Sequence, residues 1–267
     1  MYTGAGGIKM TQLIQLENAA NVRELGGYKT TSGKTIKRKK LIRSAAINEL
    51  SETDQATLSN YGINQIIDFR SYEEAKAQPD QPIRYAQQFF LPIFSEDETM
   101  VSLSPETLKQ KLADGDDAED QMKKVYRHFV ESPHARKQYR HFFDLVLENA
   151  EAGATLFHCT AGKDRTGFGA FLLLSLLEVD QSTIKQDYLA TNRYLGPFLK
   201  EKFAPMAQQM PPEVLEAITT LMSAKESFLD ESLAAIKKEF GTVDQYLKEG
   251  LAITKDEKEY FHAHFTE

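Results

Sequence analysis

The clearest pattern of apolar and polar residues lies between Gly153 and Val179. It begins with GATLFHC, a short apolar run with the composition of a buried strand. It ends with FGAFLLLSLLEV, which is too long for a strand and predicts a buried helix that stops at Asp180. A turn with Gly162 and Gly167 separates the two runs. The pattern therefore predicts a strand, a tight loop and a buried helix in direct succession.

Further strands and helices are predicted around this unit. NQIIDFRS and QFFLPIF have the character of strands, and Ser71 with Glu74 forms a capping box that starts a helix after the first. The polar composition of residues 94–120 predicts a solvated connection that caps the next helix. The other expected helices occupy residues 51–62, 121–132, 134–150, 180–195, 196–223 (as one helix or two), 225–240, 242–249 and 255–264. We therefore expect an α/β protein with a central mixed or mostly parallel sheet flanked by helices, and a helical insertion after the buried helix.

Composition limits the class of protein. The chain has 267 residues, 41% of them hydrophobic, so residues 10–267 are expected to form one domain. Residues 1–9 are Gly-rich and are interpreted as a disordered tail or a remnant of the expression vector. The formal net charge of −7 argues against nucleic acid as a partner.

Cysteine usage and hydropathy bear on the location of the protein. The single cysteine excludes an internal disulfide, and a reactive thiolate favours a reducing compartment. The chain contains neither a signal-peptide core nor a transmembrane segment. We expect a cytoplasmic protein, although a secreted mature form whose signal had been removed would look the same.

The predicted loop carries its own chemistry in HCTAGKDRTG, where Cys159 ends the strand and Arg165 follows six residues later. A tight loop before a helix turns successive backbone N–H groups inward at the positive end of the helix, which suits a phosphate. The residues that would bind phosphate in this way are Thr160, Ala161, Gly162 and Lys163. A helix N-terminus and a nearby cation also lower a thiol pKa from about 8.5 to roughly 3.5–7.5, which would make Cys159 a nucleophile.

Side chains beside the loop support catalysis. Arg165 carries a planar fork of donors that can hold two phosphoryl oxygens at once. Thr166 can donate a hydrogen bond to the sulfur and so improve it as a leaving group, and His158 is expected to fix the backbone of Cys159 from behind. A lone cysteine is usually an inert buried residue. Here it stands at the mouth of a strand-loop-helix unit among these groups, so we favour the catalytic interpretation.

These residues resemble the H-C-x5-R-[ST] signature of the cysteine-dependent tyrosine phosphatase superfamily. The form HCxAGKDRTG is similar to one branch, the atypical bacterial tyrosine phosphatases of broad or dual specificity, some of which also act on phosphoinositides. The resemblance covers about residues 18–267. It implies a tyrosine-phosphatase-like fold, hydrolysis of phosphate monoesters through a phosphocysteine on Cys159, and no metal or other cofactor.

Other segments resemble the same branch. NVRELGGY is similar to N-F-R-D-L-G-G-Y, which implies that Asn21 and Arg23 brace or line the loop; a surface hairpin is an equally open interpretation. IDFRS is similar to I-D-x-R-S and implies a supporting role for Asp68 and Arg70, with helix capping and a local ion pair as the alternative. Relatives use helices near residues 196–223 as a mobile cover of the site, and ordinary helical packing is the alternative there.

The branch implies that Asp164, inside the loop, is the general acid that protonates the leaving group. Most of the wider superfamily uses an Asp on a separate upstream loop, but the region where we would expect one offers only Glu131 in a helical context. The alternative role of Asp164 is to hold the loop by accepting hydrogen bonds.

Three interpretations of the function remain open, two of which differ in the substrate. A phosphotyrosine protein is the first, and a phosphoinositide is the second, because Lys163 adds charge within the loop that Asp164 only partly offsets. Inorganic phosphate is the product in both cases. The third is a catalytically silent phosphate-binding module, which would need Arg165 but not the thiolate of Cys159.

Overall fold

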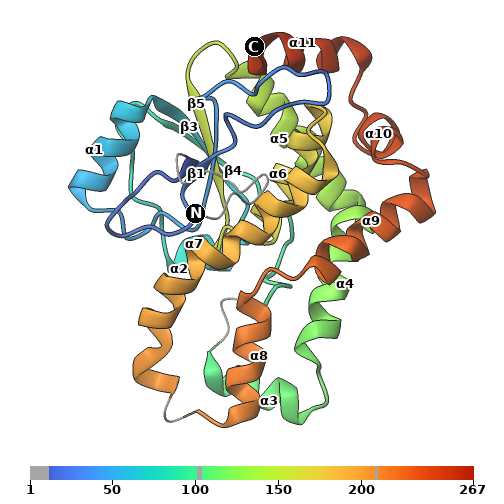
Figure 1. Cartoon of the computed structure of the whole chain (residues 1–267). Helices are drawn as coiled ribbons and strands as arrows, with labels where there is room; N and C mark the ends of the chain where they lie inside the picture. The colour runs from blue at the N-terminus through green and yellow to red at the C-terminus, as the bar shows by residue number, and fades with distance from the viewer. Residues whose placement is uncertain (1–11, 101–103, 208–209) are drawn as a thin grey trace, which may run out of the picture.

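The computed structural model describes residues 12–100, 104–207 and 210–267. Within these residues five strands form one sheet in the order β1-β2-β5-β3-β4 (Figure 1). β1 pairs with β2 antiparallel, and the other neighbours are parallel. The strands are β1 (Arg23–Glu24), β2 (Leu41–Ser44), β3 (Ile63–Asp68), β4 (Gln87–Phe90) and β5 (Ala154–His158). The prediction of a mixed, mostly parallel sheet flanked by helices is confirmed; the predicted tail at residues 1–9 lies outside the described part.

The helices cover both faces of this sheet and extend beyond one end of it, where α3, α4, α7 and α8 lie (Figure 1). They are α1 (Glu52–Tyr61), α2 (Tyr72–Ala77), α3 (Pro105–Ala113), α4 (Ala118–Glu131), α5 (Pro133–Glu148), α6 (Arg165–Leu176), α7 (Gln181–Ala207), α8 (Pro212–Met222), α9 (Glu226–Phe240), α10 (Val243–Gln245), the short π-helix η2 (Tyr246–Gly250) and α11 (Lys255–Phe265). No helix in the described ranges is long and apolar enough to cross a membrane.

Each face of the sheet has its own apolar cluster, because successive side chains of a strand point to opposite faces. Ile66 and Leu156 belong to a cluster that also contains Leu58 of α1. Their neighbours in the chain, Ile67 and Phe157, belong to the larger cluster formed with α4, α5, α6 and α9. The central strands are therefore buried at nearly every position, as expected for parallel strands covered on both faces.

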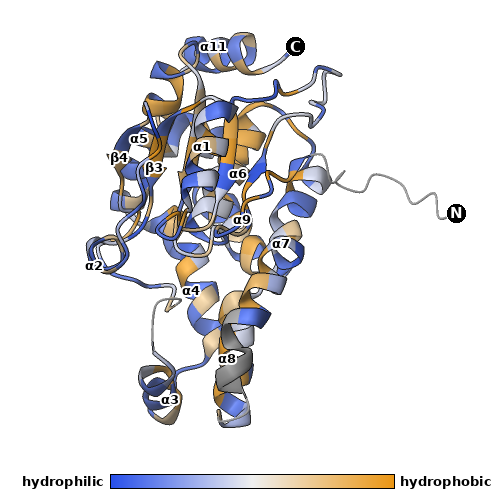
Figure 2. Cartoon of the chain, turned by 90° about the vertical axis from the view of Figure 1, so that its left-hand side faces the viewer, coloured by the Kyte–Doolittle hydropathy of each residue, from blue (hydrophilic) through white to orange (hydrophobic). Residues whose placement is uncertain are grey.

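Helix α6 lies at the centre of the larger cluster, and Figure 2 shows it as a mostly hydrophobic helix in the middle of the molecule. Of its residues only Ser175 is not buried. The Phe168 ring stacks on Phe129 of α4 and meets Tyr139 of α5 edge-on. This packing explains the long apolar run in the sequence, and it fixes the start of α6 at the end of the sheet.

Three predicted boundaries differ from the structure. The connection at 94–120 contains helix α3, which starts at a Ser104 cap with Pro105 in its first turn and buries only Leu108. Strand β4 ends at Phe90 rather than continuing to residue 94, since Pro92 has no N–H for a sheet. The predicted helix break at residue 196 is absent, because α7 continues to residue 207.

Candidate active site

The predicted strand, loop and helix meet at the carboxyl edge of the sheet. β5 ends at His158, the loop runs from Cys159 to Asp164, and α6 begins at Arg165. β3 lies beside β5 and ends in Asp68, which pairs in register with His158. The thiol of Cys159 is therefore buried, at 2% exposure, just before the positive end of a helix.

Gly162 sets the conformation of the loop. Its φ of 64° lies in the left-handed region, and a Cβ at this position would overlap the backbone of Ser44. The amide of Asn21 and the guanidinium of Arg43 donate to the Gly162 carbonyl at 3.0 and 2.8 Å. Segments more than a hundred residues upstream therefore hold the loop from outside.

The groups that hold Gly162 belong to a buried charge network. Asp187 of α7 accepts from Arg43 at 2.5 Å, from Arg23 at 3.2 Å and from the Tyr28 hydroxyl at 3.0 Å. Burial alone raises the pKa of Asp187, but the two arginines lower it below its usual value. Burial also lowers the pKa of Arg23 to about 10. Arg23 in turn donates to the side chain of Asn21. Of the predicted braces, Asn21 contacts the loop directly and Arg23 contacts it through Asn21.

Sequence reasoning missed Arg43 and Asp187. Arg43 stood beside a basic run at Lys37–Lys40 that we expected to be solvated, and Asp187 was only a part of a predicted helix. The available signal was the pair of arginines on adjoining strands, which would need a buried counter-ion if both faced inward.

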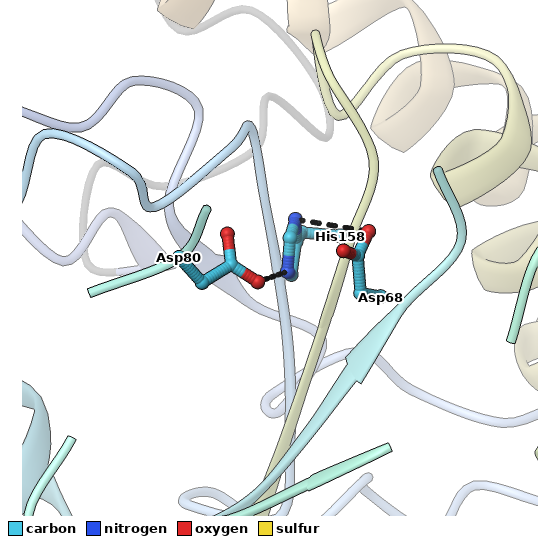
Figure 3. A group of neighbouring side chains, drawn as sticks. All are labelled: Asp68, Asp80 and His158. Carbon is cyan, nitrogen blue, oxygen red and sulfur yellow. Dashed lines mark hydrogen bonds and ion pairs between the residues drawn. The ribbon is translucent and has the colours of Figure 1, made fainter. Parts of the chain in front are cut away.

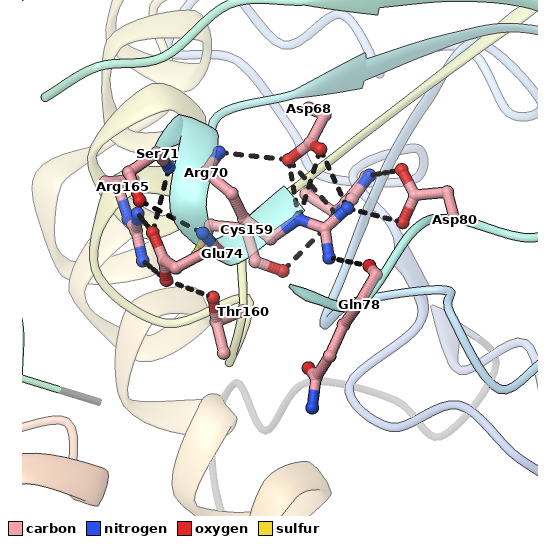
Figure 4. Close-up of polar contacts among 10 residues, drawn as sticks. Asp68, Arg70, Ser71, Glu74, Gln78, Asp80, Cys159, Thr160 and Arg165 are labelled. Atoms are coloured by element: carbon pink, nitrogen blue, oxygen red, sulfur yellow. Dashed lines mark hydrogen bonds and ion pairs between the residues drawn. The ribbon is translucent and has the colours of Figure 1, made fainter. Parts of the chain in front are cut away.

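Arg165 is held by Glu74 of α2 in a two-pronged ion pair, with Nη1 at 2.5 Å and Nη2 at 2.8 Å from the two carboxylate oxygens. Glu74 also accepts from the Thr160 hydroxyl and, at 2.8 Å, from the Ser71 amide (Figure 4). Burial alone raises the pKa of Glu74, but these contacts, with Arg165 first, lower it to about 2. The predicted capping box of Ser71 and Glu74 is present; the sequence did not reveal that the same carboxylate holds Arg165.

Two buried polar atoms at the loop have no hydrogen-bond partner among the described residues, Nε of Arg165 and the hydroxyl of Thr166. A buried donor left unpaired costs about 1–3 kcal/mol. Glu74 binds both Nη atoms of Arg165, so Nε is the donor of this guanidinium that is open to an anion. The Thr166 hydroxyl is likewise available to a thiolate or a phosphoryl oxygen.

Behind the loop, His158 lies between the carboxylates of Asp80 and Asp68, at 3.0 and 3.9 Å (Figure 3). Burial alone lowers the pKa of His158, but the charges of Asp80 and then Asp68 raise it above its usual value. The three side chains bring ligand atoms within 4.8 Å of one another, as a metal site would. The guanidinium of Arg70 supplies a positive charge to this group. It donates to both oxygens of Asp68 and to Asp80 at 2.8 to 3.1 Å. The predicted residues Asp68 and Arg70 therefore belong to the charged group behind the loop that surrounds His158.

Lys163 and Asp164 point to helices outside the loop. The ammonium of Lys163 donates to the Leu221 and Ser223 carbonyls at the end of α8 and lies 3.3 Å from Asp164. Burial lowers the pKa of Lys163. Asp164 accepts from the Tyr126 hydroxyl of α4 at 2.8 Å. The charged side chains of Lys163 and Asp164 therefore already have partners within the fold.

Helix α7 packs over the loop at the segment that we predicted as a cover. Ala161 and Leu195 share a small apolar cluster with Ala20 and Ala45, and Phe198 packs against it. This packing explains why α7 continues through Gly196 and Pro197: the apolar residues on either side face the same cluster.

Comparison with known proteins identifies the family. A sequence model of the tyrosine phosphatase family matches residues 14–267, so the chain belongs to this family and is a phosphatase. A protein of Cupriavidus necator that is named a tyrosine-protein phosphatase is 33% identical over 245 residues, 90% of this chain and 84% of the relative. The triple specificity protein phosphatase PtpB of Mycobacterium tuberculosis is 26% identical over 88% of this chain and 92% of its own. Among solved structures, the alignment with TpbA of P. aeruginosa covers 76% of this chain and 89% of the TpbA chain, at 11% identity and a TM-score of 0.34.

Replacing Glu74 should misplace Arg165. We expect Glu74→Gln to lower turnover of p-nitrophenyl phosphate about 10²-fold, the loss typical of a catalytic group shifted by about 1 Å. Glu73→Gln, which alters an exposed carboxylate of the same helix, is the matched control and should keep its activity. Equal turnover by the two variants would show that Glu74 does not position Arg165.

The effect of Glu74→Gln on stability should depend on pH. The pKa of Glu74 falls from 4.5 to about 2 in the folded protein, so its stabilisation is complete above pH 4.5 and is lost as the pH falls toward 2. The difference in unfolding free energy between the wild type and Glu74→Gln, measured by urea denaturation, should shrink over this range. A difference that stays constant would contradict the ion pair.

Removing Asp187 should destabilise the fold. Asp187→Asn leaves Arg23 and Arg43 buried without their counter-ion, which costs about 3–5 kcal/mol. Urea denaturation should show this loss, whereas Glu201→Gln on the exposed side of α7 should change stability little. The network would not be needed for folding if the two variants were equally stable.

Proposed function

We propose that this phosphatase hydrolyses phosphate monoesters in two steps through a phosphocysteine on Cys159. In the first step the thiolate attacks phosphorus, and the P–O bond of the substrate breaks; in the second step water releases inorganic phosphate. Arg165 and the backbone N–H groups of the loop stabilise the charge on the phosphoryl oxygens. Thr166 assists the departing sulfur. The observation that carries the proposal is the buried, unpaired Nε of Arg165 beside the buried thiol.

We propose that the protein is a protein tyrosine phosphatase of broad specificity, with phosphotyrosine proteins as its substrates. The family and the names of the relatives support phosphotyrosine, and the triple specificity in the name of the Mycobacterium tuberculosis relative supports a broad range. The argument for a phosphoinositide rested on the extra charge of Lys163. That ammonium is already bound by two carbonyls and by Asp164, so its contacts favour the protein substrate.

We propose a cytoplasmic location, since the thiolate of Cys159 needs a reducing compartment. Recovery of the phosphatase activity from the culture medium rather than from the cell lysate would contradict this location.

A direct test compares the wild type with Cys159→Ser and Arg165→Lys on a phosphotyrosine peptide. We expect turnover that is insensitive to EDTA in the wild type and nearly absent in both variants, because one lacks the nucleophile and the other lacks the planar fork. Phosphoinositide should be turned over more slowly than the peptide. Tight phosphate binding without turnover by the wild type would favour the silent binding module, and substantial activity of Cys159→Ser would refute the phosphocysteine.

We further propose that residues 196–223 cover the site, apart from residues 208 and 209, which lie outside the described part. The packing of Phe198 against the cluster that contains Ala161 and the bond of Lys163 to the end of α8 support this role. Saturating inorganic phosphate should order the loop and, through Lys163, slow hydrogen exchange in α8 while α11 is unchanged. Exchange in α8 that does not respond to phosphate would contradict a cover.

A further inference from the structure

A phosphatase of this kind needs a proton donor for the leaving oxygen, and among the described residues three carboxyl groups lie at the arginine of the loop. Glu74 and Asp97 pair with Arg165, and Asp164 precedes it in the chain. A general acid must reach the leaving oxygen and must be protonated when the substrate is bound. These two requirements separate the three groups.

Glu74 fails the second requirement. Both of its oxygens are bound by Arg165, and Thr160 and Ser71 donate to them as well. Burial alone raises the pKa of Glu74, but these donors lower it to about 2, so the group stays ionised at neutral pH. Its part is to position the guanidinium.

Asp164 is committed to a different set of contacts. One carboxylate oxygen accepts from the Tyr126 hydroxyl at 2.8 Å and lies 3.3 Å from the ammonium of Lys163. The Tyr126 hydroxyl is itself 2.7 Å from that of Tyr188. These contacts tie the Asp164 carboxylate to α4 and to Lys163. They suit the loop-holding role that the sequence left open for Asp164.

Asp97 comes from a separate segment, between β4 and α3. One of its oxygens lies 3.9 Å from Nη2 of Arg165, and its side chain is 9% exposed. The Thr99 amide donates to the same oxygen at 3.1 Å and the Thr99 hydroxyl donates to it as well, which fixes the direction of the carboxyl group. Asp97 therefore reaches the phosphate-binding arginine from outside the loop that carries the nucleophile.

The segment that carries Asp97 is anchored on α4. Phe94 stacks on the rings of both Phe129 and His128, with ring centroids 5.2 Å apart in each pair. The Glu98 carboxylate pairs with His128 at 2.7 Å, and its carbonyl accepts from Gln121 at 3.1 Å. These contacts flank Asp97 in the chain and keep it beside the site.

Building on the proposed function, we infer that Asp97 is the general acid and base of the reaction. As the Cys159 sulfur forms its bond to phosphorus and the P–O bond breaks, the Asp97 carboxyl gives its proton to the leaving oxygen. The resulting carboxylate then takes a proton from the water that attacks phosphorus. The S–P bond breaks, phosphate leaves, and the thiolate and the neutral carboxyl group are restored. A bound phosphate dianion favours the neutral form of a carboxyl group beside it, as the first step requires.

The test compares Asp97→Asn with Asp164→Asn on aryl phosphates whose leaving groups differ in basicity. A lost general acid lowers the rate most for poor leaving groups, which need the proton. For Asp97→Asn we expect kcat/KM to fall about 10²–10⁴-fold on phenyl phosphate and much less on p-nitrophenyl phosphate. For Asp164→Asn we expect a similar fall on both substrates, since a distorted loop affects every substrate.

Controls make the outcome decisive. Glu96→Gln, on the same segment and exposed, should leave both rates unchanged, and Asp97→Glu should keep the wild-type ratio between the two substrates because it keeps a carboxyl group. Binding of inorganic phosphate reports whether each variant is folded. The inference would be overturned if Asp97→Asn kept the wild-type ratio of kcat/KM on p-nitrophenyl phosphate to kcat/KM on phenyl phosphate. It would also be overturned if Asp164→Asn alone raised this ratio. If the wild-type enzyme itself had no Cys159-dependent turnover, the proposed function would fail instead.

Discussion

Four buried cations around one short loop are the constraint on which this structure depends. The side chains of Arg23, Arg43, Lys163 and Arg165 are at most 1% exposed. A buried charge without a partner costs several kcal/mol, so each cation must be met by an acceptor from elsewhere in the chain. The acceptors come from α2, α7 and the end of α8. The need to neutralise the loop thus draws these helices together around it.

The way in which the cations are satisfied leaves the loop ready for an anion. Asp187 and the Gly162 carbonyl take up Arg43, and Asp187 takes up Arg23 as well, so these cations are used within the fold. Glu74 binds both Nη atoms of Arg165 and leaves Nε unpaired. The unpaired Nε of Arg165 therefore lies where a phosphoryl group can meet the thiol.

The carboxylates near the loop have different surroundings and therefore different roles. Asp187 and Glu74 are held ionised by arginines, which suits a structural part and a positioning part. Asp164 is held by a tyrosine and a lysine. Asp97 touches the site from a segment of its own, so it can approach the substrate from a direction that the loop cannot supply. Residue type alone does not distinguish these four acids.

Local features of the chain predicted much of the fold and the centre of the site. The apolar run after HCTAGKDRTG, the helix cap at Ser51 and the break at Pro133 depend on residues close in the chain, and the structure has each element where the sequence indicated it. The connection at 94–120 was predicted less well. Its helix buries a single leucine, and so its hydrophobic pattern is too weak to reveal a helix.

By itself, the sequence determined the nucleophile, the arginine and the loop between them, because these lie within one continuous segment. Only the tertiary structure decided which acids serve them. The partners of the buried arginines lie 91, 144 and 164 residues away in the chain. Each pairing follows from the order of the strands and the path of α7, which no local pattern encodes. For the same reason Asp97 looked like one acid in a solvated connection until the fold brought it to Arg165.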